Sequence, residues 1–120
     1  MKRVVITGAG TINALGHNVP DTLEAMRDGR CGIGDLALRD VDRLAIRIGG
    51  QVRDFAAEAH FNRQQLALYD RFTQFTLIAA REAIAQAGLD FAGELAASSG
   101  VVLGTAGGGG CAKGASQYWY

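Results

Sequence analysis

The chain opens with a glycine pair whose spacing could hold a phosphate group. In RVVITGAGTINALG, residues 3–16, an apolar run is followed by Gly8 and Gly10. A dinucleotide fingerprint, G-x-G-x-x-G, needs a third glycine where this sequence has Asn13. The next helix is expected only near Pro20, too late for its N-terminus to meet a phosphate at Gly10. The acidic residue expected about 20 residues further on is also missing. The pattern therefore favours a turn that lets the chain pack closely.

Cysteine and histidine side chains could supply a nucleophile, a base or metal ligands. Cys31 and Cys111 lie far apart, without CxxC or His-paired spacing, so neither a zinc site nor a disulfide framework is indicated. Cys111 follows a glycine loop whose N–H groups could hold an oxyanion, and Lys113 could stabilise its thiolate. No predicted base lies nearby, however. We expect His17 and His60 at the surface and Cys31 as a small packed side chain, and we assign no catalytic residue and no metal site.

Composition indicates one modest globular domain without an electrostatic partner. The 120 residues include 48% hydrophobic and 20% charged side chains, and twelve acidic residues balance twelve Lys and Arg. A net charge of zero offers no attraction to nucleic acid or to an anionic membrane. The apolar run at residues 4–6 is broken at once by Thr7 and Gly8, so it is too short for a signal peptide. We expect a cytoplasmic protein with no cofactor, no nucleic-acid partner and no membrane partner.

Hydrophobic periodicity and stop signals predict an α/β chain. Apolar runs rich in β-branched residues predict two short strands buried on both faces, one at residues 3–8 and one within residues 99–110. Alternation around Gly49 and Gly50 predicts a half-exposed edge or hairpin strand within residues 46–55. The other expected segments are a helix from Pro20 to the stop at Gly29, a loop at residues 30–36, a short helix at residues 62–69, and a long helix at residues 71–87 closed by Gly88.

The long helix is expected to meet more than one neighbour. At about 100° per residue, its main apolar face covers an arc of about 160°. The residues on this arc are Phe72, Thr76, Leu77, Ala79, Ala80, Ala83, Ile84 and Ala87. Ile78 and Ala85 form a second apolar island. Ala79, Ala80 and Ala83 on the main arc leave room for a sheet or another helix to approach closely. An ordinary core helix of a small α/β domain is the alternative.

Five stretches resemble, in order and spacing, the N-terminus of the β-ketoacyl-acyl-carrier-protein synthases, the elongating condensing enzymes of fatty acid and polyketide synthesis. They are RVVITGAGTINALG, LEAMRDGRCGIG, IRIGGQVRDF, YDRFTQFTLIAAREAIAQAGL and GVVLGTAGGG. The resemblance covers residues 2 to about 109. DRF before an alanine-rich helix and GTAGGG after it are specific together, although each is weak alone. The opening turn then resembles the first strand and loop of a thiolase-like fold, with no nucleotide involved.

The resemblance implies the N-terminal part of a thiolase-like αβαβα fold, with a mixed sheet and packed helices, in a homodimer or heterodimer of synthase subunits. It also implies an acyltransferase that takes an acyl chain from an acyl carrier protein onto a cysteine. Two histidines then help to condense that chain with a malonyl-derived carbanion. A helix N-terminus and backbone N–H groups suit such a thiolate and its oxyanion. The family's Thr-Ala-Cys and His-Gly-Thr motifs do not occur in this sequence, so we expect the chain alone to be inactive.

The same resemblance assigns a role to the second glycine loop. In the family, a Gly-Ser/Thr-x-x-Gly-Gly loop borders the acyl pocket. The matching residues here are Gly104, Thr105, Gly107, Gly108 and Gly109. Relatives often carry a bulky residue at the position of Gly107, so its glycine implies a roomier pocket. A flexible turn that only reverses the chain is the alternative.

The end of the sequence departs from the family pattern. We expect residues 1–110 to belong to the synthase N-terminal domain and residues 111–120 to be an atypical tail from a truncated or frameshifted reading frame. Two other functions stay open at this point. One is a non-catalytic synthase partner of the chain-length-factor type, and the other is a dinucleotide-binding module. Fatty acid, polyketide and nodulation-type lipid synthesis are equally compatible with the sequence.

Overall fold

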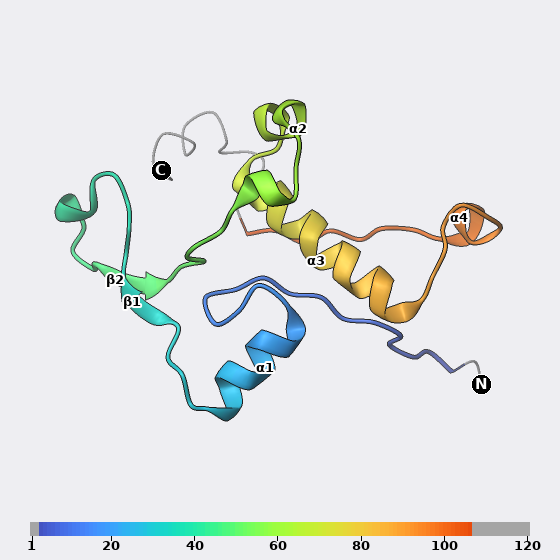
Figure 1. Ribbon diagram of the computed structural model, residues 1–120, viewed down its shortest axis with the longest axis horizontal. Helices are drawn as coiled ribbons and strands as arrows, with labels where there is room; N and C mark the ends of the chain where they lie inside the picture. Colours follow the sequence, from blue (N-terminus) through green and yellow to red (C-terminus); the bar gives the residue numbers. More distant parts are fainter. Residues whose placement is uncertain (1–2, 107–120) are drawn as a thin grey trace.

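One long helix, α3 (Arg71–Ala87), runs through the middle of the computed structural model, which describes residues 3–106 (Figure 1). The other elements are the helices α1 (Val19–Arg27), α2 (Arg63–Leu68) and α4 (Leu95–Ser98), the short 3-10 helices η1 (Val41–Arg43) and η2 (Ala57–Ala59), and the strands β1 (Ile33–Asp35) and β2 (Ile48–Gly50). This mixture of helices and strands agrees with the predicted α/β class. No helix within residues 3–106 is both long enough and apolar enough to cross a membrane.

Local capping explains why the helix boundaries were predictable. The Asp70 carboxylate accepts a hydrogen bond from the Thr73 N–H at 2.8 Å and starts α3, and Gly88, with a φ of 63°, ends it. The Asn18 side chain accepts from the Asp21 N–H at 2.8 Å and starts α1. These contacts join residues close in sequence, so a local pattern can predict them. The helices predicted at residues 20–29 and 71–87 are confirmed.

Within residues 3–106, β1 and β2 form an antiparallel two-stranded sheet. It pairs Ile33 with Gly50 and Asp35 with Ile48. The hairpin strand predicted within residues 46–55 is confirmed in a shorter form, but the prediction of a loop at residues 30–36 is wrong. The glycine-rich sequence of residues 30–36 has little intrinsic strand preference, and residues 33–35 become a strand because they pair with β2.

The opening segment packs against α3 through its two glycines. A Cβ on Gly8 would meet the carbonyl oxygen of Ala83 and, at 3.1 Å, the Cβ of Ala87. A Cβ on Gly10 would meet the carbonyl oxygen of Ala79 and, at 3.0 Å, the Ala83 nitrogen. The three alanines recur every four residues and lie on one face of the helix. The close approach predicted for the glycines and for two of these alanines is confirmed.

Two predicted buried strands are wrong. Residues 3–8 and the described part of residues 99–110 run as extended chain outside any strand (Figure 1). Val4 is 96% exposed and Val102 is fully exposed. An apolar run becomes a buried strand only when other elements cover both of its faces. The described residues provide no such cover.

The described residues bury few side chains. Ala25 and Phe61 are buried, together with Gln74, whose Nε2 donates to the Tyr69 carbonyl oxygen at 2.9 Å. Gln74 lies outside the apolar arc expected to face the core, and Ile84 on that arc is 40% exposed. Many large apolar side chains within residues 3–106 are exposed, among them Val4, Ile6 and Val102.

Replacing Gly10 with alanine should lower the free energy of unfolding by about 1–3 kcal/mol, because the new Cβ would overlap the Ala79 carbonyl. Urea unfolding followed by circular dichroism measures the change. Gly93→Ala is the matched control, since no heavy atom lies within 4 Å of a Cβ placed there. Equal unfolding midpoints for the two variants would contradict the close packing.

Candidate functional site

Protein groups occupy the N-terminus of α1, where a dinucleotide-binding protein would hold phosphate. The Glu82 carboxylate on α3 accepts hydrogen bonds from the Val19 N–H at 2.7 Å and from the Thr11 N–H at 2.9 Å. The neighbouring Gln86 side chain accepts from the Ala9 N–H at 2.6 Å. The positive end of the α1 dipole therefore faces a carboxylate of the protein itself. This carboxylate also ties the opening segment to α3.

Asn13, at the place of the missing third glycine, organises the turn before α1. Its Nδ2 donates to the Thr11 and Thr22 hydroxyl oxygens, each at 3.0 Å, and its Oδ1 accepts from the Leu15 N–H at 2.8 Å. The Asn13 N–H donates to the Gly16 carbonyl at 2.9 Å. These bonds use the polar groups of the turn internally, so the geometry favours a structural turn over a dinucleotide site.

An aromatic cluster around Phe55 joins the segment after β2 to α3. The Phe55 ring stacks on His60 with centroids 5.9 Å apart, and it meets Phe75 edge-on at 5.0 Å and His17 edge-on at 6.3 Å. The guanidinium of Arg71 lies 5.6 Å from the Phe55 centroid and 5.1 Å from that of Phe75. Ring stacking and cation–π attraction make this cluster a packing feature.

The two histidines differ in exposure. His60 is exposed, as predicted, whereas His17 is half-buried, with its Nε2 2.8 Å from the Arg53 carbonyl oxygen. His17 is thus still partly accessible at the surface, as predicted, although the turn before α1 folds back against the segment after β2. Neither histidine contacts a cysteine, so no nucleophile and base pair forms within residues 3–106.

Cys31 is exposed, so its prediction as a packed side chain is wrong. Its thiol lies 3.9 Å from the Ile33 carbonyl, within the same turn of chain. The hairpin that begins two residues later leaves the thiol facing outward. Within residues 3–106, no group of three or more Cys, His, Asp and Glu side chains is placed to hold a metal ion.

The predicted acyl-pocket loop is only partly within the described residues. Gly104 and Thr105 are exposed, and no heavy atom lies within 4 Å of a Cβ placed on Gly104. The other predicted pocket residues, Gly107, Gly108 and Gly109, lie outside the described residues. So do Cys111, Lys113 and the tail at residues 111–120. Residues 3–106 alone therefore place no pocket wall opposite Gly104.

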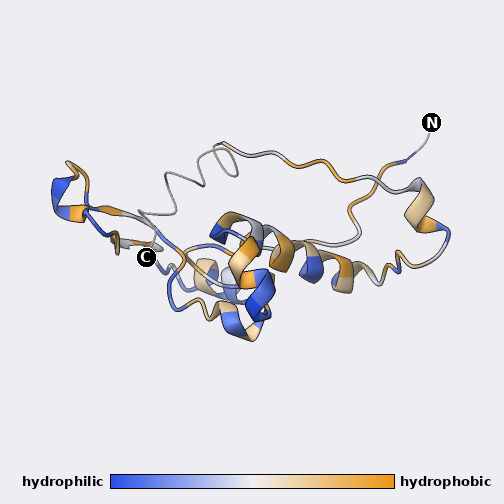
Figure 2. Ribbon diagram, turned by 90° about the horizontal axis from the view of Figure 1, so that it is seen from above, coloured by the Kyte–Doolittle hydropathy of each residue, from blue (hydrophilic) through white to orange (hydrophobic). Residues whose placement is uncertain are grey.

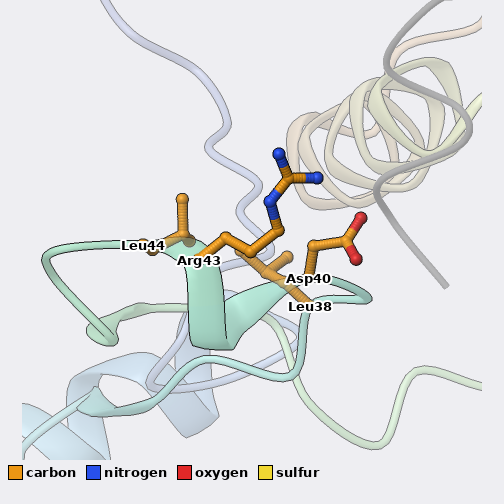
Figure 3. A pocket seen from close by; sticks show the side chains of 4 residues that line it. All are labelled: Leu38, Asp40, Arg43 and Leu44. Carbon is orange, nitrogen blue, oxygen red and sulfur yellow. The ribbon is translucent and has the colours of Figure 1, made fainter.

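A shallow hollow of about 430 Å³ lies in the chain between the hairpin strands (Figure 3). Its lining comes from Leu38, Asp40, Arg43 and Leu44, at and next to η1. In Figure 3 the charged ends of Asp40 and Arg43 both extend away from the ribbon. None of the predicted acyl-pocket residues lines this hollow, so it is not the predicted acyl pocket.

Known proteins match nearly the whole chain. Residues 1–118 match the family described as "Beta-ketoacyl synthase, N-terminal domain". The chain is 36% identical over 108 residues to 3-oxoacyl-[acyl-carrier-protein] synthase 2 of Staphylococcus aureus strain N315, covering 90% of this chain and 26% of that protein. Over 108 residues it is 38% identical to the synthase 2 of a Synechocystis species, with the same coverage. It is 37% identical to nodulation protein E of a Rhizobium species, over 90% of this chain and 27% of that protein. The chain thus spans about a quarter of the length of these relatives.

Substituting Glu82 with alanine should detach the opening segment from α3, because two backbone N–H groups would lose their acceptor. We expect a loss of about 1–3 kcal/mol in unfolding free energy. The Thr11 and Val19 amides should also exchange with deuterium faster than in the parent. Glu58→Ala, at an exposed carboxylate, serves as the control. Unchanged exchange at both amides in Glu82→Ala would show that this carboxylate does not hold the segment.

Proposed function

Because the chain belongs to the β-ketoacyl synthase family, matching its N-terminal domain, we propose that it serves as the N-terminal part of a 3-oxoacyl-acyl-carrier-protein synthase. The reaction proposed for the whole synthase condenses an acyl thioester with malonyl-acyl-carrier protein. The single observation that carries this proposal is the 36% identity across 90% of the chain to a protein of that name. The proposed partners are an acyl carrier protein and a second synthase subunit, and the proposed compartment is the cytoplasm.

The proposed contribution of this region is structural. Its sequence has neither the Thr-Ala-Cys nor the His-Gly-Thr motif, so the nucleophile and the histidines would come from the remainder of the synthase. We therefore expect this chain alone to leave acyl thioesters unchanged. In the complete enzyme it would supply α3, the segments beside it and the glycine loop.

The proposed fold of the complete protein is thiolase-like. Residues 3–8 and 99–106 run in the same direction, and α3 runs in the opposite direction between them in the sequence (Figure 1). A strand, a returning helix and a second parallel strand make the usual crossover unit of α/β sheets. This order of directions supports the proposed thiolase-like fold.

The proposed acyl-pocket wall is the loop formed by Gly104, Thr105, Gly107, Gly108 and Gly109. Gly104 agrees with such a role, since the space that a side chain would occupy there is open. With no side chain at Gly107, the pocket would accept longer acyl chains than that of a relative with a bulky residue at this position.

A chimera tests the proposed activity. Residues 1–108 of this chain replace the matched segment of the Staphylococcus aureus synthase, and condensation is assayed with acyl- and malonyl-acyl-carrier protein. We expect the chimera to condense at a rate within about tenfold of the parent, a change of about 1.4 kcal/mol in the barrier. The isolated chain should show no condensation. A chimera that folds, by circular dichroism and thermal melting, but does not condense would overturn the proposed function.

Gly107→Phe in the same chimera tests the acyl-pocket loop. The added ring should narrow the pocket, so kcat/KM should fall for long acyl chains and change little for short ones. Gly93→Phe, at an open position before α4, is the control with the same added volume. If both variants keep the parent's chain-length profile, the loop does not border the pocket.

A further inference from the structure

The β1–β2 hairpin projects away from α1, α2 and α3 (Figure 1). Figure 2 shows the molecule from a second direction, with the hairpin again extending to one side and with hydrophilic and hydrophobic residues close together near its tip. A two-stranded sheet is only marginally stable by itself in water, because one pair of strands buries little apolar surface. Ile33 and Ile48, one on each strand, are both more than half exposed. Contacts at the base of the hairpin must therefore hold it in place.

Residues 51–55, which we call the strap, follow β2 directly and bind the other side of the hairpin through two side chains. The Gln51 Oε1 accepts a hydrogen bond from the Ala37 N–H at 2.8 Å, and the Gln51 Nε2 donates to the Ala37 carbonyl oxygen at 3.3 Å. The Arg53 Nη2 donates to the carbonyl oxygen of Asp35, the last residue of β1, at 2.6 Å. The strap thus fastens the chain after β2 to β1 and to the residues that follow β1.

The backbone of the strap is bound from the opposite direction. The His17 Nε2, in the turn before α1, lies 2.8 Å from the Arg53 carbonyl oxygen, and because a carbonyl oxygen only accepts, Nε2 is the donor of this bond. The Arg71 Nη2, at the start of α3, donates to the Val52 carbonyl oxygen at 2.9 Å, and the same guanidinium lies 5.6 Å from the Phe55 ring centroid. Arg53 is therefore bonded on two sides, to the turn through its carbonyl and to β1 through its side chain.

Asp54 bends the strap between these contacts. Its φ of 53° lies in the left-handed region, and within residues 3–106 it is the one residue other than glycine with a positive φ. A residue with a Cβ is disfavoured in this region, although aspartate tolerates it better than most, and such a conformation persists where surrounding contacts hold it. Arg53 before the bend reaches β1, and Phe55 after it packs edge-on against Phe75 of α3 at 5.0 Å. The bend thus lets neighbouring residues bind two different parts of the molecule.

We propose that the strap couples the β1–β2 hairpin to the turn before α1, so that the two parts open together. Arg53 is the positioning residue of this coupling, because its bond to His17 and its bond to Asp35 lie in series and the loss of either breaks the same connection. The two parts also lie close together, since a Cβ placed on Gly50 would be 3.7 Å from the Ala14 Cβ. Neighbouring segments joined in this way commonly open as one cooperative unit. The coupling is a property of this chain and does not depend on the proposed condensation.

Hydrogen exchange on the full chain, with two single variants and their double variant, tests the coupling. Arg53→Ala removes the guanidinium bond, and His17→Phe removes the N–H donor while keeping a ring beside Phe55. The reporter in the hairpin is the Leu36 amide, which donates to the Arg47 carbonyl oxygen at 2.8 Å. We expect each single variant to exchange this amide about fivefold faster, as suits the loss of one hydrogen bond. The double variant should exchange it no faster than either single variant, because the connection is already broken.

A second reporter lies in the turn, away from the Arg53 side chain. The Asn13 amide donates to the Gly16 carbonyl oxygen at 2.9 Å, and we expect Arg53→Ala to speed its exchange at least about twofold. Arg43→Ala is the matched control, since Arg43 lies exposed in η1 of the same hairpin and outside the strap. It should leave both amides unchanged. An unchanged Asn13 amide in Arg53→Ala, or single effects on Leu36 that multiply in the double variant, would overturn the coupling.

The bend at Asp54 provides a test that does not rely on removing a bond. Asp54→Gly should slow the exchange of the Leu36 amide by about threefold, because glycine adopts a positive φ without steric cost. Asp54→Val should speed it, because a β-branched residue is strongly disfavoured there. Amides in the middle of α3 serve as the internal reference for folding, and Asp54→Gly keeps the proposal testable if Arg53→Ala loses folded structure. A change in the same direction in both Asp54 variants would show that the strap does not hold the hairpin.

Discussion

The position of the opening segment on α3 depends on the contact between two glycines and the backbone of that helix. Gly8 and Gly10 bring the opening segment so close to Ala79 and Ala83 that a side chain on either glycine would overlap a helix carbonyl. At this distance the Glu82 and Gln86 side chains reach the backbone N–H groups of the segment. Glu82 also reaches the first turn of α1. Glycine is needed here for space, and the polar bonds follow from the close approach.

This contact also explains why the glycine pair resembles a nucleotide site without being built as one. In both situations glycine allows a backbone to come close to something, a phosphate in one and a helix in the other. The difference lies in what faces the next helix. Here the Val19 N–H at the start of α1 meets the Glu82 carboxylate, and Asn13 bonds within the turn. A carboxylate held at that helix end would repel a phosphate group.

The apolar segments at residues 3–8 and 99–106 lie outside any strand. A sheet strand is stable when both its faces and its edges have neighbours, and within residues 3–106 Val4 and Val102 stay almost fully exposed. The relatives are about four times as long as the matched segment. Gly104 likewise has no neighbour within 4 Å of a Cβ placed on it, so residues 3–106 do not enclose a pocket there.

The sequence by itself determined the features that depend on neighbouring residues. The ends of α1 and α3 follow from Asn18, Asp70 and Gly88, which act within one turn of helix. Motif order was enough to indicate the family. Tertiary structure alone decided that residues 33–35 pair with β2, that His17 is half-buried and Cys31 exposed, and that Glu82 holds the start of α1. Each of these depends on residues distant in the chain, and so does the exposure of Val4 and Val102. No local pattern encodes such contacts, because burial is a property of the whole assembly.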